Sequence, residues 1–100
     1  MKERKFILKI IRHIEREFGV IAYGYKWVNP SKTWNVWNIC ISDCDVYGDK
    51  RFKAISNAYR IAWKKAFPNN IRMGFSYCNP IENNLLRLAE QDNLIMNFDE

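Results

Sequence analysis

The stretch Asp49–Phe67, DKRFKAISNAYRIAWKKAF, sets the architecture expected of this 100-residue chain. At 3.6 residues per turn its large apolar side chains recur on one side, which predicts an amphipathic helix capped by Asp49. The predicted buried stripe consists of Phe52, Ile55, Tyr59, Ala62, Trp63 and Ala66. A second stripe, polar and cationic, recurs at three- and four-residue steps and consists of Lys50, Lys53, Asn57, Arg60 and Lys64.

Residues 2–18 predict a second helix of the same kind. Its apolar stripe consists of Phe6, Ile7, Ile10, Ile11, Ile14 and Phe18. Gly19 follows at the position of a left-handed helix cap. The solvent side carries the cations Lys2, Lys5, Lys9, Arg12 and Arg16. His13, at the edge of the apolar stripe, is interpreted as a boundary residue and not as a catalytic one.

Residues 20–28 and 33–42 are rich in Val, Ile, Tyr and Trp and predict two strands. The turn-forming segment 29–32 between them predicts an antiparallel hairpin. Keeping one face apolar predicts a core face made of Ile21, Tyr23, Tyr25, Trp27, Trp37, Ile39 and Ile41. The opposite, mixed face is then expected to carry Gly24, Lys26, Trp34, Val36 and Asn38.

Residues 71–77 alternate as a further strand, with Arg72, Gly74 and Ser76 on the outer face. That polar outer face predicts a sheet covered on one side only. Asn79 followed by Pro80 predicts a third helix, and residues 94–98 a short last strand. The expected fold is therefore a single α+β domain, residues 1–100, in the order helix, strand, strand, helix, strand, helix, strand. Its mixed sheet is expected to have the helices packed on one face.

Composition narrows the function classes. The chain is 48% hydrophobic, enough for a core, and has no apolar run long enough to cross a membrane. The N-terminal residues do not resemble a signal peptide, and three cysteines fit a reducing compartment, so a cytoplasmic protein is expected. Residues 1–80 hold fifteen Lys and Arg against six Asp and Glu, whereas residues 81–100 hold one Arg against five acids. This asymmetry is typical of an anion-binding body with an acidic tail, or of a tail that neutralises basic neighbours.

A possible ligand site follows the second strand, at Asp43, Cys44 and Asp45. If the strands before and after the central helix are parallel, these residues share a sheet end with Cys78 and Asn79, where ligands often bind. Ser42–Val46 resembles the paired-aspartate segment of nucleotidyltransferases, but lacks the upstream Gly-Ser pair and a third acid on the next strand. Turn formation and helix capping are the favoured interpretation of these aspartates.

Metal binding is not expected. Tyr47 and Ala54 stand where a calcium loop requires oxygen ligands. The candidate zinc ligands Cys40, Cys44, Cys78 and His13 do not follow a zinc-site spacing, so the cysteines are expected to be buried free thiols. No cofactor is predicted.

The surface is the remaining candidate for function. The sequence favours a small, non-catalytic binding protein that engages an anionic partner, most consistently nucleic acid. The predicted contacts are Lys5, Lys9, Arg12, Arg16, Lys50, Lys53, Arg60 and Lys64, with Lys26, Trp34 and Arg72 on the open sheet face. An alternative is an accessory factor, such as a small regulator or inhibitor, that contacts an acidic protein surface. A third is a small metal- or nucleotide-dependent enzyme that uses Asp43 and Asp45.

Overall fold

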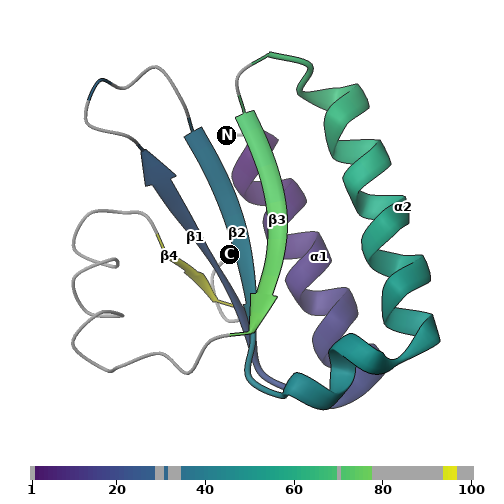
Figure 1. Ribbon diagram of the computed structural model, residues 1–100. Coiled ribbons are helices and arrows are strands. Elements are labelled where there is room, and N and C mark those ends of the chain that lie inside the picture. The colour runs from purple at the N-terminus through teal and green to yellow at the C-terminus, as the bar shows by residue number, and fades with distance from the viewer. Residues whose placement is uncertain (1, 29–30, 32–34, 70, 78–93, 97–100) are drawn as a thin grey trace.

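The computed structural model describes residues 2–28, 31, 35–69, 71–77 and 94–96. Its elements, in chain order, are α1 (Lys2–Phe18), β1 (Ala22–Val28), β2 (Asn35–Ile41), the 3₁₀ helix η1 (Cys44–Gly48), α2 (Lys50–Ala66), β3 (Ile71–Tyr77) and β4 (Leu94–Met96). This order confirms the predicted α+β arrangement (Figure 1). The helix predicted after Asn79 lies outside the described residues, and η1 is an element that the sequence pattern did not predict.

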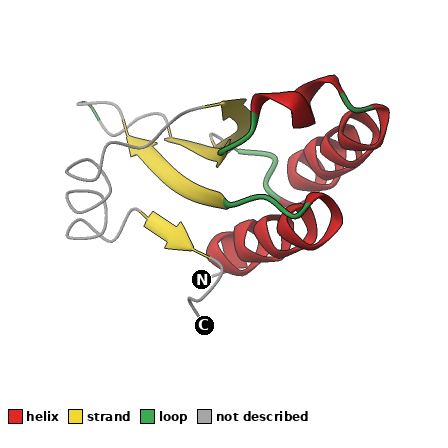
Figure 2. Cartoon of the chain, turned by 90° about the horizontal axis from the view of Figure 1, so that it is seen from below, coloured by secondary structure: helices red, strands yellow, loops and turns green. Residues whose placement is uncertain are grey.

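The four strands form one mixed sheet in the order β3-β2-β1-β4. β1 pairs antiparallel with β2 and β4, which confirms the hairpin, and β2 pairs parallel with β3. The parallel pair brings the carboxyl ends of β2 and β3 to the same edge of the sheet, as predicted. Both helices lie side by side on one face of the sheet (Figure 2).

Helix α1 forms because a dense aliphatic stripe faces the sheet. Its buried residues are Ile7, Leu8, Ile10, Ile11 and Ile14. The helix ends at Gly19, whose φ of 65° is the left-handed conformation that glycine adopts without strain. The Gly19 amide donates to the Glu15 carbonyl at 2.9 Å, so the predicted cap is confirmed.

Helix α2 begins where predicted, because the Asp49 carboxylate accepts a hydrogen bond from the Arg51 amide at 2.8 Å. Its buried residues are Phe52, Ser56 and Trp63. Ala62 and Ala66 are exposed, so the predicted stripe is too wide. Helix α2 therefore packs against the rest of the protein through a few large side chains. One of them, Trp63, contacts the Phe6 ring of α1, with the ring centroids 5.3 Å apart.

The predicted face of β1 is wrong. Ala22 pairs with Ile41, Gly24 with Ile39 and Lys26 with Trp37, so these residues of β1 share the helix side of the sheet. A Cβ added at Gly24 would lie 2.5 Å from Cγ2 of Ile7. The close approach of α1 therefore selects the small residues of β1 and turns its tyrosines to the other face.

That other face is partly buried, which contradicts the expectation of a sheet covered on one side only. Tyr23 is 6% exposed and Cys40 is fully buried. Asn38 lies on this face as predicted, and its amide donates to the Tyr25 hydroxyl at 3.1 Å and to Ser76 Oγ at 2.5 Å. These hydrogen bonds tie β1, β2 and β3 together through their side chains.

The alternation predicted for β3 is confirmed. Ile71, Met73 and Phe75 pack against the core, whereas Arg72 is exposed. The Trp63 indole donates to the Ile71 carbonyl at 3.4 Å, which links α2 to the start of β3. Ile95 of β4 is buried beside Gly24, on the helix side of the sheet, and extends the core to the β4 edge.

Candidate functional site

A groove of about 430 Å³ runs along α1 and is closed on one side by a residue of α2. The described residues that line it are Lys5, Leu8, Lys9, Arg12, His13, Arg16 and Tyr59. We refer to this surface as the basic groove. It contains the four α1 cations that the sequence predicted as contacts.

The four cations reach the groove because of their spacing. Lys5, Lys9, Arg12 and Arg16 are separated by four, three and four residues, so they lie along one side of the helix. All four side chains are exposed. At 1.5 Å per residue the row extends for about 16 Å along α1.

A pair of rings lies beside this row. Nδ1 of His13 lies 2.7 Å from the Tyr59 hydroxyl, and the two ring planes meet at 80° with centroids 5.5 Å apart. Phe6 packs edge-on against Tyr59 at 6.3 Å between centroids. Tyr59 thus contacts two α1 residues that lie about two helical turns apart, and its hydroxyl orients the His13 ring.

Burial raises the pKa of the Tyr59 phenol, and the nearby positive charge of Arg16 opposes this shift in part. The phenol therefore stays protonated at neutral pH and serves as a neutral hydrogen-bonding group. Since the described lining residues include four cations and no Asp or Glu, the groove attracts anions.

The α2 cations lie outside the basic groove. Lys50, Lys53, Arg60 and Lys64 are exposed, but none of them lines it. The Arg60 guanidinium lies over the Phe75 ring of β3, 5.1 Å from its centroid, and donates to the Asn57 side chain at 3.3 Å. Arg60 is therefore directed toward β3, whereas its neighbour Tyr59 is directed toward α1.

The predicted sheet-face contacts have three different outcomes. Lys26 lies on the helix side of the sheet, with Nζ 5.9 Å from the centre of the Trp37 ring, so its placement on the open face was wrong. Arg72 is exposed on the face of the sheet opposite the helices, as predicted. Trp34 lies outside the described residues.

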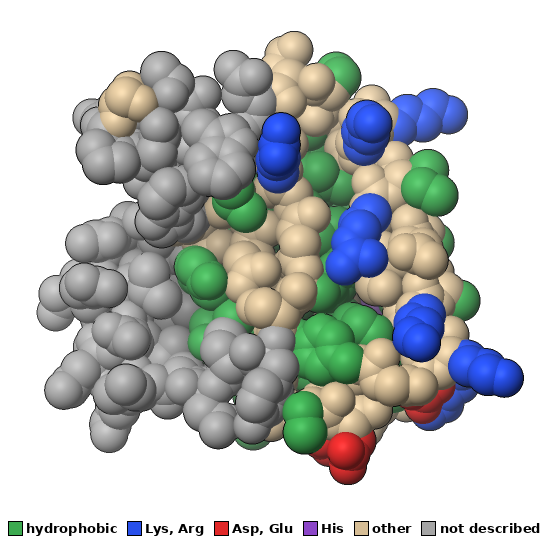
Figure 3. Space-filling model, in the orientation of Figure 1, with side chains coloured by type: hydrophobic (Ala, Val, Ile, Leu, Met, Phe, Trp, Pro, Cys, Tyr) green, Lys and Arg blue, Asp and Glu red, His purple; other side chains and the backbone are tan. Residues whose placement is uncertain are grey.

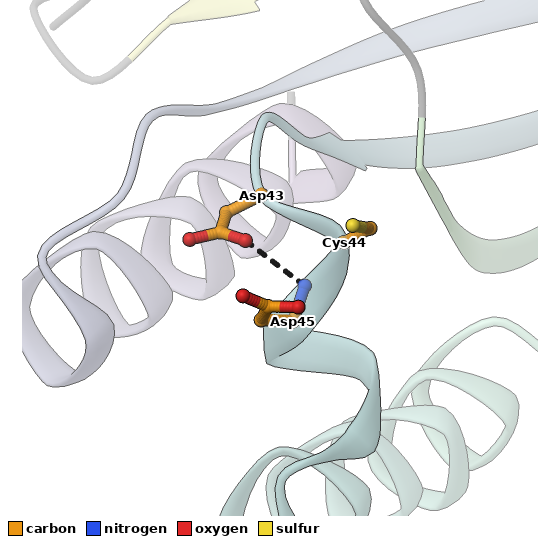
Figure 4. Close-up of side chains that lie close together, drawn as sticks. All are labelled: Asp43, Cys44 and Asp45. Carbon is orange, nitrogen blue, oxygen red and sulfur yellow. Dashed lines mark hydrogen bonds between the residues drawn. The ribbon is translucent and has the colours of Figure 1, made fainter.

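Asp43, Cys44 and Asp45 form an exposed cluster whose possible ligand atoms lie within 4.8 Å of one another (Figure 4). The Asp43 carboxylate accepts a hydrogen bond from the Asp45 amide at 2.9 Å and caps η1. At the next helix start, hydrogen bonds from Arg51 lower the pKa of Asp49, the cap of α2. The predicted capping role is confirmed for Asp43 and Asp49.

The cysteines differ from the predicted set of buried free thiols. Cys44 is free but exposed. Cys40 is buried and disulfide-bonded. A disulfide-bonded sulfur is not available as a thiolate ligand, so the zinc set that included Cys40 is incomplete in this state.

Two groove residues were not recognised from the sequence as functional. Tyr59 belongs to the predicted buried stripe of α2, and His13 was interpreted as a boundary residue. The feature of the sequence that could have indicated them is that both are polar aromatic residues at the edges of apolar stripes. Their meeting depends on how α1 and α2 pack, which neither stripe encodes alone.

Comparisons with protein-family models, with curated proteins and with solved structures gave no match for this chain. None of the described helices is both long enough and apolar enough to cross a membrane.

Proposed function

We propose that this protein binds nucleic acid through the basic groove. The observation that carries the proposal is that Lys5, Lys9, Arg12 and Arg16 line one groove. A row of four cations about 16 Å long suits a ligand with repeating negative charges better than a single small anion. The excess of Lys and Arg in residues 1–80 adds a field that attracts such a ligand over a longer range.

The proposed role is binding and not catalysis. The groove supplies cations to neutralise phosphates and a neutral phenol at Tyr59, which suits positioning of a ligand. The cations of α2, Lys53, Arg60 and Lys64, are proposed as a secondary contact because they lie outside the groove. The two rows can therefore be tested separately.

The test is a fluorescence anisotropy titration of labelled, mixed-sequence 12-nucleotide RNA and DNA between 50 and 200 mM salt. If the four groove cations each neutralise one phosphate, log K against log salt should have a slope of about −3 on single strands. The decisive variant replaces Lys5, Lys9 and Arg16 by alanine. Its matched control replaces Lys53, Arg60 and Lys64 of α2 by alanine. Both variants therefore lose two lysines and one arginine.

The groove variant should lose about ten- to a hundredfold in affinity at 0.1 M salt, and its slope should become shallower by about 2. The α2 variant should lose markedly less. Equal losses in both variants would show that net charge, and not the groove, governs binding. If the unmodified protein fails to bind either nucleic acid even at 50 mM salt, the proposal is wrong, and an acidic protein surface becomes the partner to seek.

A further inference from the structure

We propose that the ligand of the basic groove is single-stranded, and that one unpaired base is held in the corner between His13 and Tyr59. This inference rests on the proposed function and names the form of nucleic acid that the groove selects. It starts from the rings that line the groove together with the cations. A surface that only neutralised phosphates would need no such rings.

The two rings form a corner suited to a flat ligand. Their planes meet at 80°, so a base stacked on one ring presents its edge to the other. Nδ1 of His13 is engaged by the Tyr59 hydroxyl at 2.7 Å, and this bond directs the other ring nitrogen, Nε2, away from Tyr59. Phe6 also packs edge-on against the Tyr59 ring, so the corner is built before the ligand arrives.

The size of the groove favours an unpaired nucleotide. A volume of about 430 Å³ falls within the range that encloses small ligands, and accommodates a base with its sugar. In a duplex the bases are stacked and paired, so entry of one base would require it to leave the helix. A single strand presents its bases without that cost, which is why aromatic side chains so often select single strands.

The cations are placed to hold the backbone on both sides of the inserted base. Lys9 lies one turn before His13 along α1, and Arg16 lies about one turn after it. Phosphates that flank the base therefore meet a cation in each direction. The groove thus combines a row of cations that binds the nucleic-acid backbone with a pocket for a single base.

The experiment compares three 12-residue ligands: a single-stranded DNA, the duplex of the same sequence, and a single strand of abasic residues with the same number of phosphates. The intact protein should bind the normal single strand at least tenfold more tightly than the other two. His13→Ala should lose about five- to twentyfold on the normal strand and little on the abasic strand. Its salt slope should be unchanged, because loss of a stacked base releases no counterions.

Lys9→Ala is the matched control from the same side of α1. It should weaken all three ligands and make the salt slope shallower by about 0.7 on the single strands and about 0.9 on the duplex. His13→Phe keeps a ring for stacking and should retain most of the single-strand preference. Tyr59→Phe, which frees His13 from its hydrogen bond but keeps the second ring, should have an intermediate effect.

Duplex or abasic ligand bound as tightly as the normal strand would overturn this inference and leave the proposed function standing. A His13→Ala variant that weakens all three ligands equally would also overturn it, since the side chain would then act only through the fold. Failure of every ligand to bind would refute the proposed function itself.

Discussion

Helices α1 and α2 look alike in sequence but dock on the sheet in different ways. Each has 17 residues, an apolar stripe and a row of cations. Every buried residue of α1 is aliphatic, and the helix lies close over Gly24 of β1. Buried contacts of α2 come mainly from the aromatic residues Phe52 and Trp63. Helix α1 therefore packs closely against small residues of the sheet, whereas the packing of α2 depends on the two large side chains of Phe52 and Trp63.

The same difference extends to the cations. On α1 they line a groove beside His13 and Tyr59. On α2 they lie on a different surface, and Figure 3 shows Lys and Arg side chains spread over the face formed by α2 and β3. Arg60 of α2 lies over the Phe75 ring of β3. A row of cations at helical spacing is therefore not a site in itself, because its role depends on what the neighbouring element places beside it.

The largest expected effect concerns the anchor of α2. Trp63→Ala should lower the free energy of unfolding by about 3–5 kcal/mol, because it empties a buried position that contacts Phe6 and Phe67. Urea unfolding followed by circular dichroism measures the loss. Ile61→Ala is the control on the same helix, and should change stability by less than about 0.5 kcal/mol because Ile61 is 71% exposed. A loss below about 1 kcal/mol for Trp63→Ala would mean that α2 does not depend on this anchor.

A smaller effect tests the close approach of α1. Gly24→Ala should destabilise the protein by about 1–3 kcal/mol, because the new Cβ would meet Ile7 and force α1 away from the sheet. Gly74→Ala is the matched control, since its nearest neighbour, Asn38 Oδ1, lies at an ordinary 3.7 Å. Thermal unfolding should separate the two variants clearly. Equal losses would indicate a general intolerance of the sheet to alanine and not a specific contact with α1.

The smallest expected effect lies at the junction of η1 and α2. The Tyr47 hydroxyl is buried beside Phe52 and has no hydrogen-bond partner in the described part of the chain. Tyr47→Phe should therefore raise the free energy of unfolding at pH 7 by up to about 1 kcal/mol. A loss of stability would instead show that the hydroxyl makes a stabilising interaction.

The same variant carries a pH signature. Burial raises the pKa of Tyr47 to about 12, whereas an unfolded tyrosine titrates near 10. Between pH 10 and 12 the unfolded chain loses this proton while the folded chain keeps it, so Tyr47 lowers stability as pH rises through that window. The stability advantage of Tyr47→Phe should widen from pH 10 to pH 12. It should be constant below pH 10.

Much of the fold follows from local patterns in the sequence. Helical spacing places α1 over residues 2–18, and the capping residues Gly19 and Asp49 mark two of the helix ends. Alternation places β3 at residues 71–77. The α1 half of the candidate site was equally accessible, because cations three or four residues apart on one helix share a side wherever that helix packs.

Contacts between elements that are distant in the sequence could not be predicted from these local patterns. On hydrophobicity alone, Tyr23 and Tyr25 were predicted to face the helices. The close approach of α1 instead requires Gly24 on that face. Because side chains alternate along a strand, a shift of one residue moves every side chain to the opposite face. The pairing of His13 with Tyr59 joins residues 46 positions apart. Periodicity within a helix determines which side chains share a face. Only the packing of α1 against α2 and the sheet decides which of those faces becomes core, groove or open surface, because that choice depends on shape complementarity between distant segments.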